Sequence, residues 1–245
     1  MSQPASFLGS SIGRKVIMAF TGVVLFGFVI GHMVGNLQVY QGPERLNAYA
    51  ETLRHYGALL WAARLGLLAA VGLHIWAAWS LTRMNRGARA VGYGEWKPQS
   101  STYASRTMRW SGVILLLFVV YHLLHFTFGA RVVHPQFVPG DVYHNFVTGF
   151  QNPLVSSFYI VSMLALGLHL YHGAWSMLQT VGVSHPWLDR ARYGLAAAVA
   201  AVIVLGNVSM PVAVMAGLVR DDRPLRPLAA STRQSAAGSQ PGAGR

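Results

Sequence analysis

Five long apolar segments constrain what this chain can fold into more than any other feature of its sequence. Each is close to or longer than the roughly 20 residues that an α-helix needs to cross the hydrocarbon core of a bilayer. Strand-like alternation of apolar and polar residues is absent from them. The sequence therefore predicts an all-α integral membrane bundle of five transmembrane helices, at roughly residues 15–38, 58–82, 109–130, 154–179 and 191–218.

The composition agrees with a membrane protein and excludes several classes of redox site. Charged residues make up 11% of the chain, against roughly 25% in soluble domains. Cysteine is absent, which excludes disulfides, thiolate zinc sites and cysteine-ligated iron–sulfur clusters. No G-x-G-x-x-G motif follows a strand-like run, so no dinucleotide-binding fold is expected. Any redox cofactor on this chain must therefore be held by residues other than cysteine.

The distribution of basic residues predicts the orientation of the chain. The net charge is +12, and the basic residues gather in short loops, which is typical of cytoplasmic loops and anionic headgroups rather than of nucleic-acid binding. The N-terminus carries Arg14 and Lys15 and is predicted to be cytoplasmic. We expect a cytoplasmic segment at 1–14, a transmembrane domain at 15–218 and a disordered tail at 219–245, which is rich in Ala, Gly, Ser and Pro.

Each of the first four apolar segments contains histidine, and the fifth contains none. A buried polar group in hydrocarbon is costly, so an ionisable residue within a membrane helix indicates a function. Asp and Glu are absent from all five membrane cores. A hydrogen bond between helices would account for one histidine, but less readily for one on each of four helices. The histidines are His32, His74, His122, His125, His169 and His172.

Chain direction places these histidines at two depths. His32 and His122 lie late in segments that run outward, whereas His74 and His169 lie late in segments that run inward. From the helical rise per residue, we expect the two levels to be on the order of 10 Å apart. Two neutral imidazoles that face each other without a carboxylate suit bis-histidine haem iron. A catalytic zinc or di-iron site would instead need carboxylates or a third ligand.

Glycines recur on the first segment beside its histidine. The stretch GFVIGHMVG places Gly27, Gly31 and Gly35 four residues apart, on the same helical face. Small residues let two helices approach closely. A flat face beside His32 would equally admit a planar macrocycle, and the two interpretations are compatible.

Several motifs, in their order and spacing, resemble those of a known family. They are SSIGRKVIMAFTG, GHMVGNLQ, GLHIWAAW, SRTMRWSGVILLLFVVYHLLHF, GFQNP and GLHLYHGAWSMLQTVG, spread over roughly residues 10–185. The chain resembles the membrane-anchor cytochrome b subunit of succinate dehydrogenase and fumarate reductase, in its single-chain, five-helix, two-haem form.

The resemblance implies a multi-pass subunit of the cell inner (cytoplasmic) membrane that holds two haem b groups and has no succinate site or catalytic residue of its own. It would pass electrons between an iron–sulfur subunit, which is partnered by a flavoprotein, and membrane quinone, with menaquinone favoured. Both succinate oxidation and fumarate reduction fit the resemblance. Two alternatives remain: the cytochrome b of another respiratory complex, such as a hydrogenase or formate dehydrogenase, and a transporter whose histidines relay protons.

The family pattern assigns the axial iron ligands residue by residue. It implies that His32 and His122 bind the outer (distal) haem, and that His74 and His169 bind the inner (proximal) haem. In the third segment, the histidine that the pattern selects is the one after Tyr121.

Further polar residues are candidates for contacts around the haems. His125 and His172 lie one turn beyond two of the ligands, where each could bond a propionate, border a quinone pocket or bond a neighbouring helix. Four arginines near the membrane edges could bind propionates or simply anchor helices at the interface. These are Arg14, Arg64, Arg106 and Arg109.

A quinone pocket is expected near the outer haem, because electrons must pass from there to an acceptor. The polar candidates near that level are Asn36, Gln38 and His125. Some members of the family carry a membrane carboxylate for proton transfer. The apolar segments of this chain contain no carboxylate, so we do not expect such a relay.

Overall fold

The structure is a computed structural model, and it describes residues 9–88, 103–180 and 186–224. All regular elements within these residues are helices. Five helical segments among them are long and apolar enough to cross a membrane, which confirms the predicted all-α bundle of five transmembrane helices. The spans are Ser11–Gln41, Gly57–Gly87, Thr107–Thr127, Pro153–Met177 and Ala191–Met215. The cytoplasmic position of the N-terminus stays a prediction.

Two of the spans end in a short turn of different pitch. Helix α1 (Ser11–Asn36) continues into the 3₁₀ turn η2 (Leu37–Gln41), and α4 (Tyr103–His122) continues into the π-helical turn η3 (Leu123–Thr127). The remaining spans are α3 (Gly57–Gly87), α6 (Pro153–Thr180) and α7 (Pro186–Met215).

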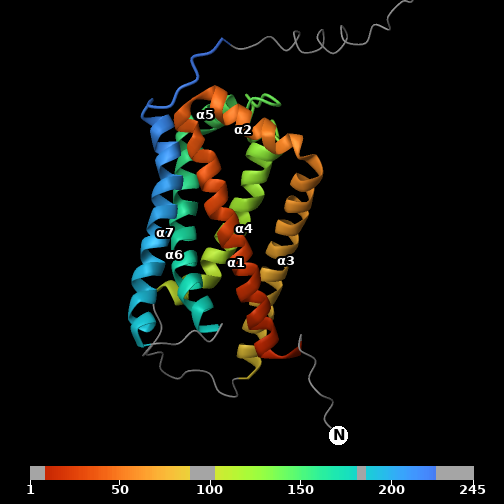
Figure 1. Ribbon diagram of the computed structural model, residues 1–245, viewed down its shortest axis with the longest axis vertical. Helices are drawn as coiled ribbons and strands as arrows, with labels where there is room; N and C mark the ends of the chain where they lie inside the picture. Colours follow the sequence, from red (N-terminus) through yellow and green to blue (C-terminus); the bar gives the residue numbers. More distant parts are fainter. Residues whose placement is uncertain (1–8, 89–102, 181–185, 225–245) are drawn as a thin grey trace, which may run out of the picture.

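Two shorter helices, α2 (Pro43–His55) and α5 (Val142–Phe150), lie together across one end of the bundle (Figure 1). We call this end the α2–α5 end, and the opposite end, where α1 begins, the N-terminal end. In the described residues, α1 packs against α3, α4 against α6, and α6 against α7. No comparable contact joins α1 to α4, or α3 to α6, within those residues.

The packed core lies at the α2–α5 end. Helix α5 begins after Asp141, whose carboxylate accepts a hydrogen bond from the backbone N–H of His144. Most side chains of α5 are buried. The membrane spans are less buried within the protein than α5 is. In the most apolar stretch of each span, 6% of the residues of α3 and 33% of those of α7 are buried. The core comprises Val39, Leu46, Tyr143, Phe146, Val147, Phe150, Tyr159, Met210, Ala213, Val214 and Val219.

Four ionisable side chains, which we call the terminal clasp, hold the chain after α7 against α5. Arg223 donates hydrogen bonds to Asp221 over 2.6 Å and to Asp141 over 3.1 Å. The fourth member is His144, whose Nδ1 lies 2.9 Å from the Asp221 carboxylate. Residues 219–224, which the sequence assigned to the tail, are therefore placed by specific contacts. The rest of the predicted tail lies outside the described residues.

Replacing Asp221 with asparagine is expected to lower the free energy of unfolding by about 1–2 kcal/mol. The Asp221 side chain is 5% exposed and accepts charge-assisted hydrogen bonds, whereas Arg223 is 38% exposed, so water screens part of the attraction. Thermal unfolding of the purified chain in detergent measures the loss. The matched control is Asp222→Asn, the same change at the exposed neighbouring residue.

The contribution of Asp221 should also depend on pH. The hydrogen bond from Arg223 holds the pKa of the Asp221 carboxyl below its ordinary value. Such a carboxyl stabilises the folded state above its unfolded pKa of about 3.9, and the stabilisation is lost as the pH falls through the folded pKa. The difference between wild type and Asp221→Asn is thus expected to shrink below about pH 4. A difference that grew on acidification would contradict this account.

Candidate functional site

The structure brings four of the predicted site histidines together in two pairs. The ring centres of His32 and His122 are 5.6 Å apart, and those of His74 and His169 are 6.3 Å apart. A first-row metal about 2 Å from one nitrogen of each ring would separate the ring centres by about 6 Å. Both separations therefore fit an iron between two imidazoles.

Each histidine pair joins two helices that do not pack against each other. His32 is on α1 and His122 ends α4, while His74 is on α3 and His169 is on α6. Close helix packing therefore does not explain why the imidazoles meet, because these helices make no extended backbone contact in the described residues. The two imidazoles of each pair therefore meet through their side chains, and not because their helices pack together.

The glycines of α1 serve two different purposes. A Cβ atom added to Gly35 would lie 2.6 Å from the hydroxyl of Tyr49, so this glycine permits close packing of α2 on α1. A Cβ atom added to Gly27 or Gly31 would meet no atom within 4 Å. The face of α1 next to His32 is therefore open to a planar ligand.

We call His74 and His169 the inner pair, and His32 and His122 the outer pair, after the predicted orientation of the chain. A buried hydroxyl contacts each histidine of the inner pair. Thr21 Oγ1 lies 3.1 Å from His74 Nδ1, and it also lies 2.8 Å from the backbone carbonyl of Ile17. Ser111 Oγ lies 3.2 Å from His169 Nδ1, and its hydrogen bonds the carbonyl oxygen of a residue in its own helix. Because each hydroxyl hydrogen goes to a carbonyl, the oxygen accepts from the imidazole Nδ1–H. This network assigns the tautomer that leaves Nε2 free to bind metal.

The outer pair has different partners. The Asn36 side-chain amide donates to His32 Nε2 over 3.1 Å, so Asn36 lies against a predicted ligand. Iron binding at this nitrogen requires the amide to turn away about its own side-chain torsions. Gln38 lies beyond Asn36 in η2, half-buried beside the core residue Val39.

His125 lies in the core of the α2–α5 end. Its side chain is 1% exposed, and a Cβ atom added to Gly149 of α5 would lie 2.9 Å from its Cε1. The hydroxyl of Tyr159 lies 3.0 Å from His125 Nδ1 and 3.3 Å from His122 Nδ1. The π-helical hydrogen bond from Phe128 N–H to the carbonyl of residue 123, over 2.8 Å, places an extra residue in this turn.

His172 lies beyond His169 on α6, towards the N-terminal end. Its ring is 4.8 Å from that of Trp175, in an edge-to-face arrangement. Within the part of the chain that the structure describes, His172 Nδ1 and Trp175 Nε1 are buried without a hydrogen-bond partner. Buried donors of this kind normally have an acceptor. An anionic oxygen next to the inner pair, such as a haem propionate, would supply one.

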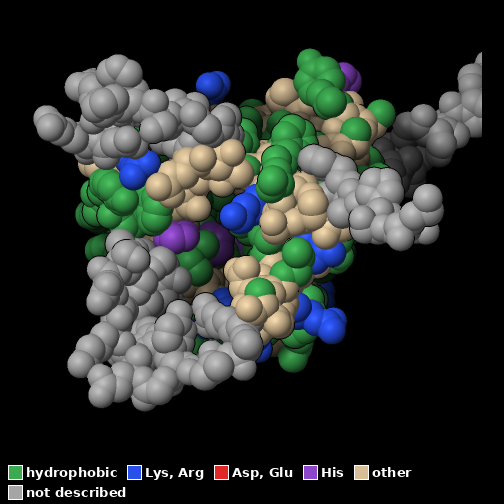
Figure 2. Space-filling view, turned by 90° about the horizontal axis from the view of Figure 1, so that it is seen from below, with side chains coloured by type: hydrophobic (Ala, Val, Ile, Leu, Met, Phe, Trp, Pro, Cys, Tyr) green, Lys and Arg blue, Asp and Glu red, His purple; other side chains and the backbone are tan. Residues whose placement is uncertain are grey.

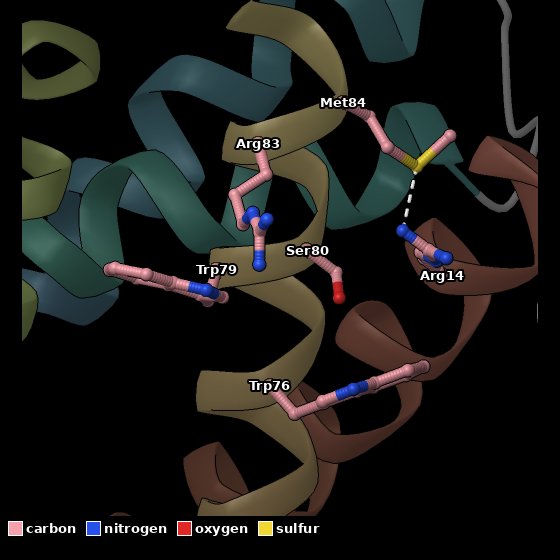
Figure 3. Close-up of a pocket in the computed structure, with 6 residues that line it drawn as sticks. All are labelled: Arg14, Trp76, Trp79, Ser80, Arg83 and Met84. Carbon is pink, nitrogen blue, oxygen red and sulfur yellow. Dashed lines mark hydrogen bonds between the residues drawn. The ribbon is translucent and has the colours of Figure 1, made fainter. Parts of the chain in front are cut away.

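Arg14 lines a cavity of about 590 Å³ at the N-terminal end, between α1 and α3 (Figure 3). It donates to Met84 Sδ over 2.8 Å and lies 5.7 Å from the centre of the Trp76 ring. Figure 3 shows Arg83 and Trp79 extending from α3 on the other side of Ser80. The cavity therefore combines two cationic groups with two indole rings. Its lining is Arg14, Trp76, Trp79, Ser80, Arg83 and Met84.

The other predicted arginines are not brought into this cavity. Arg64 is exposed near the start of α3, 5.1 Å from the centre of the Trp61 ring, and Arg109 is exposed on α4. Arg106 lies in the first turn of α4, and its side chain is outside the described part. Seen from the N-terminal end, the described surface carries Lys and Arg around a hollow in which histidine is visible, and no Asp or Glu (Figure 2).

Sequence reasoning missed three residues that contact the histidine pairs: Thr21, Ser111 and Tyr159. A Ser or Thr hydroxyl in a membrane helix commonly bonds its own backbone, and Tyr159 is one of several aromatic residues in its segment, so nothing in the sequence distinguishes these three. Their roles emerge only when α1 is placed beside α3 and α4 beside α6.

A family model described as the succinate dehydrogenase/fumarate reductase transmembrane subunit matches residues 85–208, just over half of the chain. The matched range contains His122 and His169, one member of each pair, and it ends before the close of α7. His32 and His74 precede it. Searches of curated proteins and of solved structures returned no match.

Proposed function

The chain belongs to the family of succinate dehydrogenase/fumarate reductase transmembrane subunits, and from this membership we propose that it is a dihaem cytochrome b that carries electrons between an iron–sulfur subunit and membrane quinone. The observation that carries the proposal is the pair of facing imidazoles at each of two levels, on helices that do not pack together. Bound haem iron would supply one-electron redox chemistry at each level.

The residues of the chain have separate roles in this proposal. His32 and His122 hold one haem b near the α2–α5 end, and His74 and His169 hold the other towards the N-terminal end. Thr21 and Ser111 keep the inner ligands in the iron-binding tautomer. His172 and Trp175 would be available to donate to a propionate of the inner haem, and Arg14 would supply a cation at the same end of the bundle.

The two ends of the bundle face different partners. Soluble flavoprotein and iron–sulfur subunits bind at the N-terminal end, where basic side chains gather, and this end faces the cytoplasm (Figure 2). Quinone, with menaquinone favoured, binds near the outer pair, with Asn36 and Gln38 as its polar contacts. His125 is a buried residue of η3 that packs against α5, which favours a supporting role over direct contact with quinone.

Two haem b groups per chain are the expected result when the full chain is expressed with its partner subunits. A reduced-minus-oxidised spectrum, with haem content measured per mole of chain, tests this. The control is His55→Ala, since His55 is an exposed histidine of α2 that should not affect haem content. A colourless wild-type chain would exclude the proposal and favour a proton-relaying transporter. Co-purification with a flavoprotein separates this complex from a hydrogenase or formate dehydrogenase.

A further inference from the structure

Tyr159 lies on α6 with its hydroxyl between two histidines of the α4–η3 segment. The oxygen is 3.3 Å from His122 Nδ1 and 3.0 Å from His125 Nδ1, and the side chain is 5% exposed. A phenol has one hydrogen and can also accept hydrogen bonds. It can therefore donate to only one of the two nitrogens, and the other must donate to it.

Iron binding decides which way these hydrogen bonds run. If His122 binds iron through Nε2, its Nδ1 carries the hydrogen and donates it to the Tyr159 oxygen. The hydrogen of Tyr159 must then go to His125 Nδ1. We infer that Tyr159 and His125 form a positioning unit that holds His122 in the iron-binding tautomer. This inference rests on the proposed haem function.

The surroundings of His125 keep it in place for this role. Gly149 allows the imidazole to lie against the backbone of α5, since a Cβ atom there would be 2.9 Å from the ring. His134 Nδ1 lies 3.2 Å from the backbone carbonyl of His125 and donates to it, which ties the π-helical turn to the following loop. The rings of Phe126 and Phe150 pack on His125 and Tyr159 respectively, at 4.1 and 4.9 Å between centres.

The contrast with the inner pair explains why α4 and its extension carry two histidines. Thr21 and Ser111 send their hydroxyl hydrogens to carbonyl groups of their own helices. A tyrosine hydroxyl stands too far from its own backbone to do the same, so Tyr159 needs an acceptor from another element. His125 Nδ1 is that acceptor.

Replacing His125 with phenylalanine is the sharpest test, because it removes the acceptor while keeping an aromatic ring in the core. The Tyr159 hydrogen is then left with His122 Nδ1, which forces the other tautomer and blocks Nε2. We expect the affinity of the outer haem to fall by about 10–100-fold. His125→Asn, which keeps an acceptor oxygen near the position of Nδ1, is expected to retain that haem.

Tyr159→Phe should have a different effect. His122 keeps the hydrogen on Nδ1 but loses the group that accepts it, so the imidazole becomes a weaker electron donor. We expect the outer haem to bind less tightly than in the wild type, as for any ligand that loses its accepting oxygen, but more tightly than in His125→Phe, where Nε2 is blocked. Its midpoint potential should shift to a more positive value and its low-spin EPR signal should change. The double variant, with both His125→Phe and Tyr159→Phe, lacks the hydroxyl that would otherwise donate to His122 Nδ1. It should therefore bind the outer haem more tightly than His125→Phe alone, which is a non-additive result.

The full chain, purified with its partner subunits, is used for all variants. Haem content, redox titration and EPR are measured, and retention of the inner haem confirms that each variant has folded. The inference is overturned if His125→Phe keeps the outer haem with wild-type affinity, or if the double variant is no better than His125→Phe. A wild-type chain without haem would instead overturn the proposed function, which separates the two failures.

Discussion

Alanine at His32 or at His122 is expected to remove one and the same haem, and alanine at His74 or at His169 is expected to remove the other. Each single variant should therefore contain half of the wild-type haem. The reason is geometric, because the rings meet across α1 and α4 in one pair and across α3 and α6 in the other. Redox titration followed by absorbance, together with EPR, identifies which haem remains. His55→Ala, at an exposed position of α2, should leave both in place.

The haem that remains also serves as the folding check, because cofactor binding and folding are linked. A variant that lost both haems would indicate misfolding rather than a missing ligand. The variant at the other histidine of the same pair would then show which haem that pair binds. If the variants at His32 and His74 lost the same haem, the proposed pairing would be wrong.

Thr21→Val and Ser111→Ala are expected to weaken binding of the inner haem by about 10–100-fold, while the outer haem is unaffected. Each change removes the oxygen that accepts from a ligand Nδ1–H, so the imidazole is free to turn and to exchange tautomers. Valine has nearly the volume of threonine, so packing of α1 on α3 is largely kept. The rate at which haem leaves the purified protein for an acceptor globin measures the effect.

A matched hydroxyl is available as the control. Thr82 on α3 donates to the backbone carbonyl of Ala78 over 2.8 Å, four residues earlier, as Thr21 does to Ile17. Thr82→Val should leave the release of haem unchanged. If the variants at Thr21 and Thr82 released haem equally faster than the wild type, the cause would be a general loosening of the helices and not the loss of the bond to His74.

The sequence predicted the spans from a simple physical requirement, and chain direction predicted which helices bring their histidines together, but the choice of His122 over His125 rested on the family pattern. A bilayer of fixed thickness demands long apolar helices, and hydrocarbon makes an isolated imidazole costly. The third span ends at Thr127, earlier than the predicted residue 130, because the chain leaves the π-helical turn there. That change of pitch has no counterpart in hydropathy.

Other features could not be predicted because they depend on tertiary contacts. Helices α2 and α5 are too short for a span and carry polar residues, so the burial of α5, and of Leu46 on α2, follows only from packing on the ends of the long helices. The tail residues 219–224 look like a linker by composition, yet Asp221 and Arg223 find partners on α5 and at its cap. Tyr159 resembles any other aromatic residue of an apolar segment until α6 is placed beside α4.

The separation between α1 and α4, and between α3 and α6, has a consequence for the life of the protein in the cell. If haem iron joins those helices, it acts as a cross-link. In a chain made during haem shortage, the described residues of α1 and α3 would then be joined to the other spans mainly by the α2–α5 end and by the contacts of α1 with α6 and α7. Such a chain would open more often and be degraded sooner. Haem supply would then set the amount of this subunit without any change in its synthesis, and so the number of complexes that the membrane can assemble.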